Sequence, residues 1–139
     1  GSSKDALKGA YVVSEAKDPK AMQGILIGTG SEVSLAIDAQ QELAKEGIDV
    51  RVVSMPCEEL FDAQSDAYKE SILPNAVRAR VAVEAAADFG WGKYVGLDGA
   101  TVTMKGFGAS APAAKLFEKF GFTKENVVKT MRDVIAKQN

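Results

Sequence analysis

The stretch GILIGTGSEVSLAIDAQQELAKEGIDVRVVS, residues 24–54, decides the fold. It opens with a continuous apolar run at residues 24–28, which is typical of a strand covered on both faces. Apolar residues then recur at helical spacing as far as Gly47, which can end a helix in a left-handed conformation. Val50, Val52 and Val53 predict the next strand. A strand, a helix and a strand with short joints predict a βαβ unit with two parallel strands.

The remaining sequence carries the same kinds of signal. Further strands are predicted at residues 11–13, 81–83 and 101–104, and helices near residues 56–61, 65–72, 112–120 and 123–135. Residues 88–99 are rich in glycine and predict a loop. Together these elements predict an α/β fold with a mostly parallel sheet and helices on both faces. Because polar and apolar residues alternate over 101–104, we expect this weaker strand to run antiparallel at an edge.

The composition is that of one globular domain. The chain has 139 residues, of which 46% are hydrophobic and 26% charged, so disorder and low-complexity polymers are excluded. Gly1-Ser2-Ser3 is typical of an expression-tag remnant, and we expect residues 4–139 to form a single domain. The net charge of −2, without a basic stripe, argues against nucleic acid as a partner. No apolar run approaches the roughly 18 residues of a membrane helix, so no membrane partner is expected.

The sequence contains no histidine, which excludes several kinds of chemistry at once. Ser-His-Asp and Cys-His catalysis, histidine zinc sites and a histidine pH switch all require that side chain. Cys57 is the only cysteine, so neither an internal disulfide nor a cysteine metal cluster can form. A single reduced cysteine suits a cytoplasmic protein.

A glycine-rich turn is the first candidate site. It consists of Gly28, Thr29, Gly30 and Ser31, between the first strong strand and its helix. Backbone N–H groups at a helix start can hold a small anion such as phosphate. Val33 occupies the third glycine position of a dinucleotide fingerprint, and the sequence contains no Walker loop. A capped turn is therefore the commoner explanation, and anion binding is the alternative.

Other candidate residues are a strand-end carboxylate, an acidic cluster, a thiol and three aromatics. They are Glu84; Glu58, Glu59 and Asp62; Cys57; and Phe89, Trp91 and Tyr94. Glu84 follows a strand at the end where open α/β sheets place ligands, so we group it with the anion-binding turn, although pairing or capping is the commoner role. Acids in a first helical turn ordinarily complement the helix dipole, and aromatics ordinarily pack under loops. No complete catalytic set results, and we predict neither a catalytic residue nor a cofactor- or metal-binding residue.

Three blocks together resemble the C-terminal domain of the transketolase family. They are GILIGTGSEVSLAIDAQQELAKEGIDVRVVSMPCEELFDAQ at residues 24–64, RVAVEAAADFGWGKYVG at residues 80–96 and FGASAPAAKLFEKFGFTKENVV at residues 107–128. The blocks GTGSEVSLA, at residues 28–36, and FGASAPA, at residues 107–113, are specific to this family. The likeness extends from about Tyr11 to Ile135. Family members often carry glycine after the VEA of the central strand, where this chain has Ala86.

The resemblance implies a fold and a parent activity. The fold would be a three-layer domain with a mixed sheet of about five strands. The parent would move two-carbon ketol units between sugar phosphates in the pentose phosphate pathway, using thiamine diphosphate and Mg or Ca held by the two preceding domains. No residue here matches those motifs, so the resemblance implies a catalytically silent domain that supports assembly with the preceding domains and the homodimer mate.

Two other functions remain open at this stage. One is a small-anion or regulatory ligand module that uses the glycine turn and Glu84. The other is a docking module of the kind found in the β chain of 2-oxo acid dehydrogenases. The wording of residues 28–36 favours transketolase.

Overall fold

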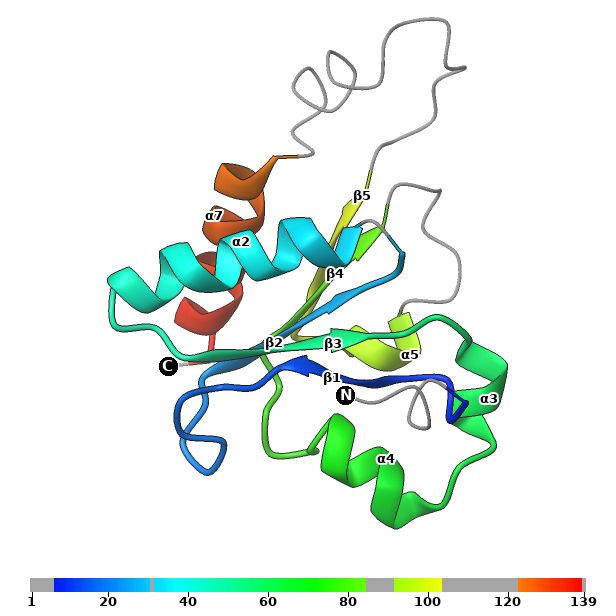
Figure 1. The fold of residues 1–139 in the computed structure, drawn as a ribbon. Coiled ribbons are helices and arrows are strands. Elements are labelled where there is room, and N and C mark those ends of the chain that lie inside the picture. Colours follow the sequence, from blue (N-terminus) through cyan, green and yellow to red (C-terminus); the bar gives the residue numbers. More distant parts are fainter. Residues whose placement is uncertain (1–6, 31, 85–91, 104–122, 139) are drawn as a thin grey trace, which may run out of the picture.

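Five strands form one mixed sheet in the order β1-β3-β2-β4-β5 (Figure 1). The computed structural model describes residues 7–30, 32–84, 92–103 and 123–138. The strands are β1 (Tyr11–Ser14), β2 (Gly24–Gly28), β3 (Val50–Ser54), β4 (Arg80–Glu84) and β5 (Ala100–Thr103). The predicted βαβ unit and the mostly parallel sheet are confirmed.

The central strand β2 sets the direction of its neighbours. It pairs in parallel with β3 on one side and with β4 on the other. β5 is an edge strand and also runs parallel to β4, so the expectation of an antiparallel strand at residues 101–104 is wrong in direction. The antiparallel edge strand is β1, which pairs with β3. Alternating polarity indicates that a strand has one exposed face, but it does not indicate the direction of the strand. The direction of β5 follows from its connection to β4, which is a crossover that contains the short helix α5 and therefore allows parallel pairing.

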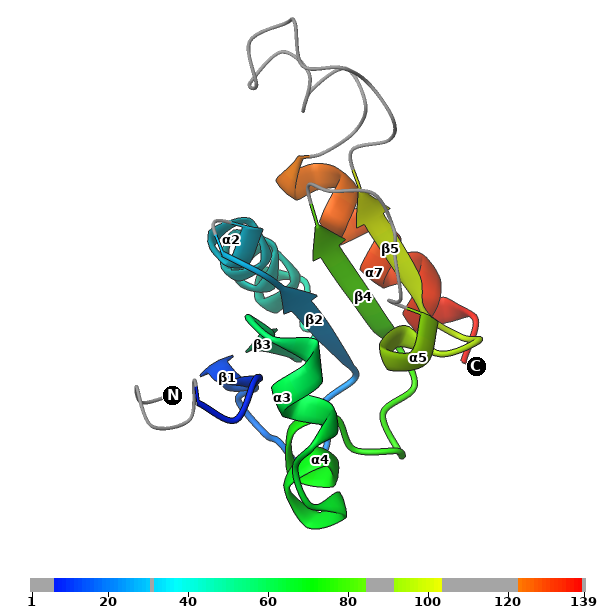
Figure 2. The same ribbon diagram turned by 90° about the vertical axis from the view of Figure 1, so that its right-hand side faces the viewer.

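Two long helices cover one face of the sheet (Figure 2). They are α2 (Glu32–Lys45) and α7 (Lys124–Ala136). Their apolar sides pack against alternate residues of the four parallel strands β2, β3, β4 and β5. The buried core on this face includes Leu26, Leu43, Val52, Val81, Val83, Val102, Val127 and Met131. The amphipathic pattern of the last helix therefore points into this core.

Three short helices cover the opposite face. They are α3 (Glu58–Asp62), α4 (Asp66–Ile72) and α5 (Gly92–Val95). Their core contains Ile25, Ile27, Phe61, Ile72 and Tyr94. All five residues of β2 are buried because alternate side chains meet the two helical layers. α5 lies where we predicted only a loop, and the predicted helix at residues 112–120 falls outside the described residues.

Side-chain caps begin two of the helices, and the predicted helix end at Gly47 is confirmed. Ser65 Oγ accepts a hydrogen bond from the Tyr68 N–H at 3.1 Å, and Thr123 Oγ1 accepts one from the Asn126 N–H at 3.2 Å. Gly47 follows α2 with a φ of 78°, which avoids the steric cost that a Cβ brings in this region. Within the described part of the chain, no helix is long and apolar enough to cross a bilayer.

Two arginines flank Ile25 in one row across the sheet. Ile25 pairs with Arg51 of β3 and with Arg80 of β4. Arg51 donates hydrogen bonds to the carbonyl oxygens of Ser71 and Ile72 at 2.8 and 3.1 Å. Arg80 donates to the next two carbonyl oxygens, those of residues 73 and 74, at 3.1 and 2.8 Å. The two guanidinium groups thus satisfy four consecutive carbonyls at the end of α4, where a helix lacks internal donors.

Each arginine also fastens a further segment. Arg51 forms a bidentate pair with Glu15, with N···O distances of 2.8 and 3.0 Å. Arg80 donates to the carbonyl oxygens of Val77 at 3.0 Å and of Tyr94 at 2.7 Å, which attaches α5. Burial lowers the pKa of Arg80, and the charge of Glu70 acts in the opposite direction. The backbone of this face therefore depends on two charged side chains from the sheet.

Replacing Arg80 should destabilise the domain far more than replacing its neighbour Arg78. Arg80→Met removes four hydrogen bonds from a charged donor, so we expect a loss of roughly 2–4 kcal/mol in the free energy of unfolding. Arg78 is exposed and makes a surface ion pair with Asp98, so Arg78→Met should cost less than about 1 kcal/mol. Urea unfolding of both variants measures the difference, and equal losses would contradict the proposed role of Arg80.

The pair of Glu15 and Arg51 should make stability depend on pH. Burial acts to raise the pKa of Glu15, but hydrogen bonds from Arg51 and from the Ala16 N–H, with the Arg51 charge, lower this pKa overall from 4.5. A lowered pKa in the folded state gives stability that is present above pH 4.5 and is lost as the pH falls through the lowered value. The difference in unfolding free energy between wild type and Glu15→Gln should therefore shrink in acid. A difference that stays constant down to acid unfolding would refute this assignment.

Candidate functional site

The predicted turn and Glu84 meet at the carboxyl ends of β2 and β4. From β2 the chain passes through α2 to β3 on one side, whereas β4 lies on the other side of β2. Strand order therefore reverses between β2 and β4, which is where open α/β sheets bind ligands. Gly28 ends β2 and Glu84 ends β4. Thr29 and Gly30 follow Gly28 directly, and Ser31 lies outside the described residues.

A short hydrogen bond joins the two strand ends. Thr29 Oγ1 donates to Glu84 Oε2 at 2.6 Å, across 55 positions of sequence. The turn also closes on itself, because the Glu32 N–H donates to the Thr29 carbonyl at 3.0 Å and the Val33 N–H to the Gly30 carbonyl at 3.3 Å. Gly30 has a φ of 52°, which favours glycine. The start of α2 is thus tied to the end of β4.

The charges around this turn are acidic. Glu84 accepts the hydrogen bond from Thr29, and Glu32 lies in the first turn of α2. Carboxylates at a helix start are favoured by the helix dipole, and they repel a second anion in the same place. Anion binding by Gly28, Thr29, Gly30 and Glu84 stays a prediction, and an anion would have to compete with these carboxylates.

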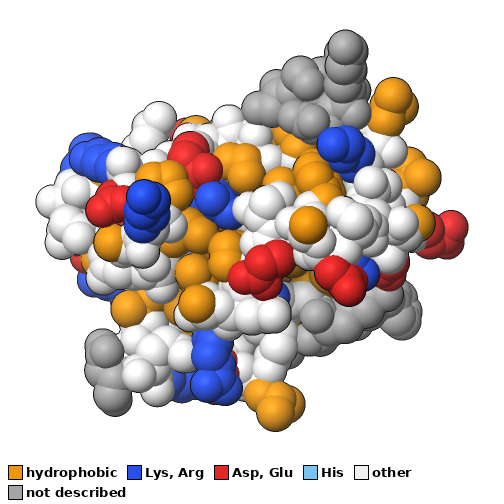
Figure 3. Space-filling model, turned by 90° about the horizontal axis from the view of Figure 1, so that it is seen from below, with side chains coloured by type: hydrophobic (Ala, Val, Ile, Leu, Met, Phe, Trp, Pro, Cys, Tyr) orange, Lys and Arg blue, Asp and Glu red, His pale blue; other side chains and the backbone are white. Residues whose placement is uncertain are grey.

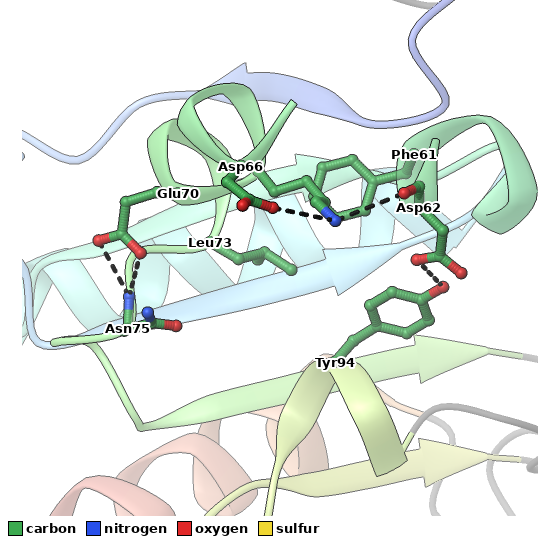
Figure 4. A pocket seen from close by; sticks show the side chains of 8 residues that line it. Phe61, Asp62, Asp66, Glu70, Leu73, Asn75 and Tyr94 are labelled. Carbon is green, nitrogen blue, oxygen red and sulfur yellow. Dashed lines mark hydrogen bonds and ion pairs between the residues drawn. The ribbon is translucent and has the colours of Figure 1, made fainter. Parts of the chain in front are cut away.

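The acidic cluster of α3 serves structural contacts. Glu58 and Glu59 lie in the first helical turn, and Cys57 occupies the N-cap position with no side-chain cap hydrogen bond. Asp62 Oδ1 accepts a hydrogen bond from Tyr94 Oη at 3.0 Å, which links α3 to α5 (Figure 4). The sequence did not indicate this link, because α5 was not predicted and the two residues lie 32 positions apart. Phe89 and Trp91 lie outside the described residues.

A cavity of about 460 Å³ opens between α3, α4 and α5 (Figure 4). Charged side chains that line this cavity form ion pairs or hydrogen bonds with neighbouring groups of the protein. Lys69 Nζ lies 3.6 Å from Asp66 Oδ1, and both carboxylate oxygens of Glu70 accept hydrogen bonds from the Asn75 N–H at 3.0 and 3.2 Å. Phe61 and Tyr94 form its buried aromatic wall, with ring centroids 6.3 Å apart.

The described residues do not fit the metal ion that the family resemblance implies. No three carboxylate or thiol side chains in this part of the chain are grouped to hold one, and the sequence has no histidine. A diphosphate at the glycine turn would lie near the carboxylates of Glu32 and Glu84, which repel an anion. We therefore derive no catalytic step from this chain.

Comparison with known proteins identifies the family. The family model described as "Transketolase-like TK C-terminal domain" matches residues 9–123. The chain belongs to this transketolase C-terminal-domain family. The match includes the two blocks at residues 28–36 and 107–113 that carried the resemblance, which is thereby confirmed.

Close relatives support this assignment over almost the whole chain. The transketolase of Streptococcus pyogenes is 56% identical over 127 residues, which are 91% of this chain and 17% of that protein. The chloroplastic transketolase of Solanum tuberosum is 52% identical over 93% of this chain and 17% of its own length. The transketolase structure from Leishmania mexicana superposes with a TM-score of 0.88 at 49% identity, covering 99% of this chain and 19% of that one. The chain thus spans less than a fifth of the length of these relatives.

These findings decide between the families considered above. The relatives named here are transketolases, so they give no support to a 2-oxo acid dehydrogenase β chain. The three-layer α/β fold with five strands agrees with the transketolase C-terminal domain. Transketolase C-terminal-domain membership therefore rests on sequence and structure together.

A double-mutant cycle tests the link between Thr29 and Glu84. Thr29→Val should lower the unfolding free energy by roughly 1–3 kcal/mol, because it removes a hydrogen bond to a carboxylate. Thr29→Ser keeps the hydroxyl and should retain most of that stability. In a Glu84→Gln background the effect of Thr29→Val should shrink, and the difference is the coupling energy from urea unfolding. Additive effects would show that the two side chains do not interact.

Proposed function

We propose that this chain is the C-terminal domain of a transketolase and that it supports assembly without taking part in the chemistry. The parent would transfer two-carbon ketol units between sugar phosphates, with thiamine diphosphate and Mg or Ca bound by preceding domains. Residues 4–139 would form the single domain, and residues 1–3 a tag remnant. The partners would be the preceding domains and the homodimer mate, in the cytoplasm and the pentose phosphate pathway.

One observation carries this proposal. More than nine-tenths of the chain matches transketolases, yet the match covers only 17–20% of their length. The parts that the match leaves out are long enough to hold the cofactor and its metal ion. The described part of this chain offers no metal ligand set of its own.

The interactions of the charged side chains also suit a structural role for this domain. At the α3–α4–α5 face, Arg51 is engaged in an ion pair with Glu15, and both Arg51 and Arg80 donate hydrogen bonds to backbone carbonyls. A reactive centre ordinarily retains groups whose pKa values are displaced toward their catalytic task. Among the described residues, the displaced pKa values belong to Glu15, Glu42 and Arg80, each explained by a structural partner or by burial.

A cofactor-binding experiment separates a scaffold from a catalyst. Calorimetry of the isolated 139-residue chain with thiamine diphosphate and Mg²⁺ should show no binding at micromolar concentration. A coupled assay with sugar phosphates should show no ketol transfer. Micromolar binding or clear turnover by the isolated chain would overturn the proposal.

A graft provides the positive arm of the test. The matching C-terminal region of the Streptococcus pyogenes transketolase, 127 residues long, would be replaced by this chain. The chimera should assemble and transfer ketol units, because the two sequences are 56% identical over that region. The same transketolase cut short before this region serves as the control, and a chimera no better than the shortened protein would contradict a role in assembly.

A further inference from the structure

The sequence contains one Asp-Gly step, at Asp98 and Gly99. It lies in the turn of residues 96–99 between α5 and β5 (Figure 2). Aspartate isomerises most readily before glycine, because glycine has no side chain that shields its backbone nitrogen from the preceding carboxyl group. A fold can prevent this reaction, so the surroundings of the two groups decide whether it occurs.

The surroundings of this turn leave both reacting groups accessible. Leu97, the residue before Asp98, is fully exposed, and the Asp98 side chain is 35% exposed. A hollow of about 260 Å³ borders Asp98, which gives its carboxyl group space to rotate. The Gly99 N–H donates to the Gly96 carbonyl at 3.4 Å, which is longer than an ordinary protein hydrogen bond. The nitrogen that would react is therefore only weakly held.

An ion pair with Arg78 restrains the carboxyl group of Asp98. The Arg78 side chain is 67% exposed. Charged side chains of both signs lie on the molecular surface (Figure 3), and ion pairs at such positions contribute little to stability and open readily in water. While the pair is closed, the guanidinium group holds the carboxylate. When the pair opens, the carboxyl group is free to approach the next backbone nitrogen.

We propose that Asp98 is a site of isoaspartate formation in this protein and that the ion pair with Arg78 slows the reaction. The Gly99 nitrogen attacks Cγ of Asp98, a nitrogen–carbon bond forms, and water leaves with one carboxyl oxygen, which gives a cyclic succinimide. Water then breaks the bond from this nitrogen to Cγ, which restores aspartate, or the bond to the main-chain carbonyl carbon, which gives isoaspartate. The sum is an isomerisation that needs no oxidant, reductant or co-reactant. It does not depend on the proposed function.

Isomerisation at this step would displace Gly99. Isoaspartate adds one carbon atom, its Cβ, to the backbone directly before this glycine. Gly99 packs so closely against the carbonyl oxygens of Val95 and Arg80 that even a Cβ on it would overlap them. Ala100, the next residue, pairs with Val81 at the start of β5. The added atom should therefore loosen the pairing of the edge strand β5 with β4.

Incubation of the folded 139-residue chain for several weeks at neutral pH and physiological temperature tests the site. A protein isoaspartate methyltransferase counts isoaspartyl groups, and electron-transfer fragmentation of the peptide that contains residue 98 locates them. Wild type should accumulate isoaspartate at residue 98. Asp98→Glu should accumulate no isomer there, because glutamate has to close a larger ring, which forms much more slowly. Absence of the isomer from the folded wild type, under conditions in which the chain unfolded in guanidinium chloride forms it, would overturn the site.

Arg78→Met tests the role of the arginine, and Arg132→Met is the matched control, because Arg132 forms an exposed ion pair with Glu46. Arg78→Met should raise the rate at residue 98 roughly two- to fivefold, which is the range that loss of an exposed ion pair can account for. Arg132→Met should leave the rate unchanged. Equal rates in the three proteins, or equal increases in both variants, would overturn the role of Arg78. In the separated isoaspartyl form, amides of residues 100–103 should exchange faster than in the aspartyl form, and unchanged exchange would contradict the loosening of β5.

Discussion

The buried strand β2 is the constraint on which the rest of the domain depends. All five of its residues are buried, and parallel strands flank it on both sides. A strand of this kind has no solvent face, so helices must cover both sides of the sheet. Leu26 packs in the core of α2 and α7, while Ile25 and Ile27 pack in the core of the three short helices. The layer order of the whole domain follows from that one placement.

The two layers are stabilised in different ways. The first layer consists of helices of 14 and 13 residues, which bury amphipathic faces. The second layer consists of helices of five, seven and four residues, and helices this short are not stable alone. Arg51 and Arg80 stabilise these short helices with hydrogen bonds. Together they donate to four consecutive carbonyls at the end of α4, and Arg80 also donates to a carbonyl of α5. The sheet therefore stabilises its second layer through charged hydrogen bonds as well as through apolar contact.

Local sequence patterns predicted individual strands and helices. The interactions between elements depend on residues far apart in the sequence, and these patterns did not predict them. The apolar run at residues 24–28, the helical spacing after it and the caps at Ser65 and Thr123 are all encoded by near neighbours. The sequence grouped Glu84 with the glycine turn at the carboxyl ends of the strands, but the hydrogen bond from Thr29 to Glu84 depends on the pairing of β2 with β4, which the sequence did not predict. The roles of Arg51 and Arg80 were not predicted either, since their partners lie on another element and single-residue chemistry does not reveal them. Motif resemblance, rather than a catalytic pattern, pointed to the family.

The loop between α5 and β5 is held by close backbone contacts. Gly99 allows the backbones of Val95 and Arg80 to approach closely, and Arg80 fastens the end of α5. Contacts with β4 thus fix the conformation of the loop that carries Leu97, and β4 itself pairs with the buried strand β2. Because the same arginine stabilises the second layer and borders the exposed leucine, core packing and surface shape are not independent here. The packing of β4 against α5 therefore determines the conformation of the loop at residues 96–99.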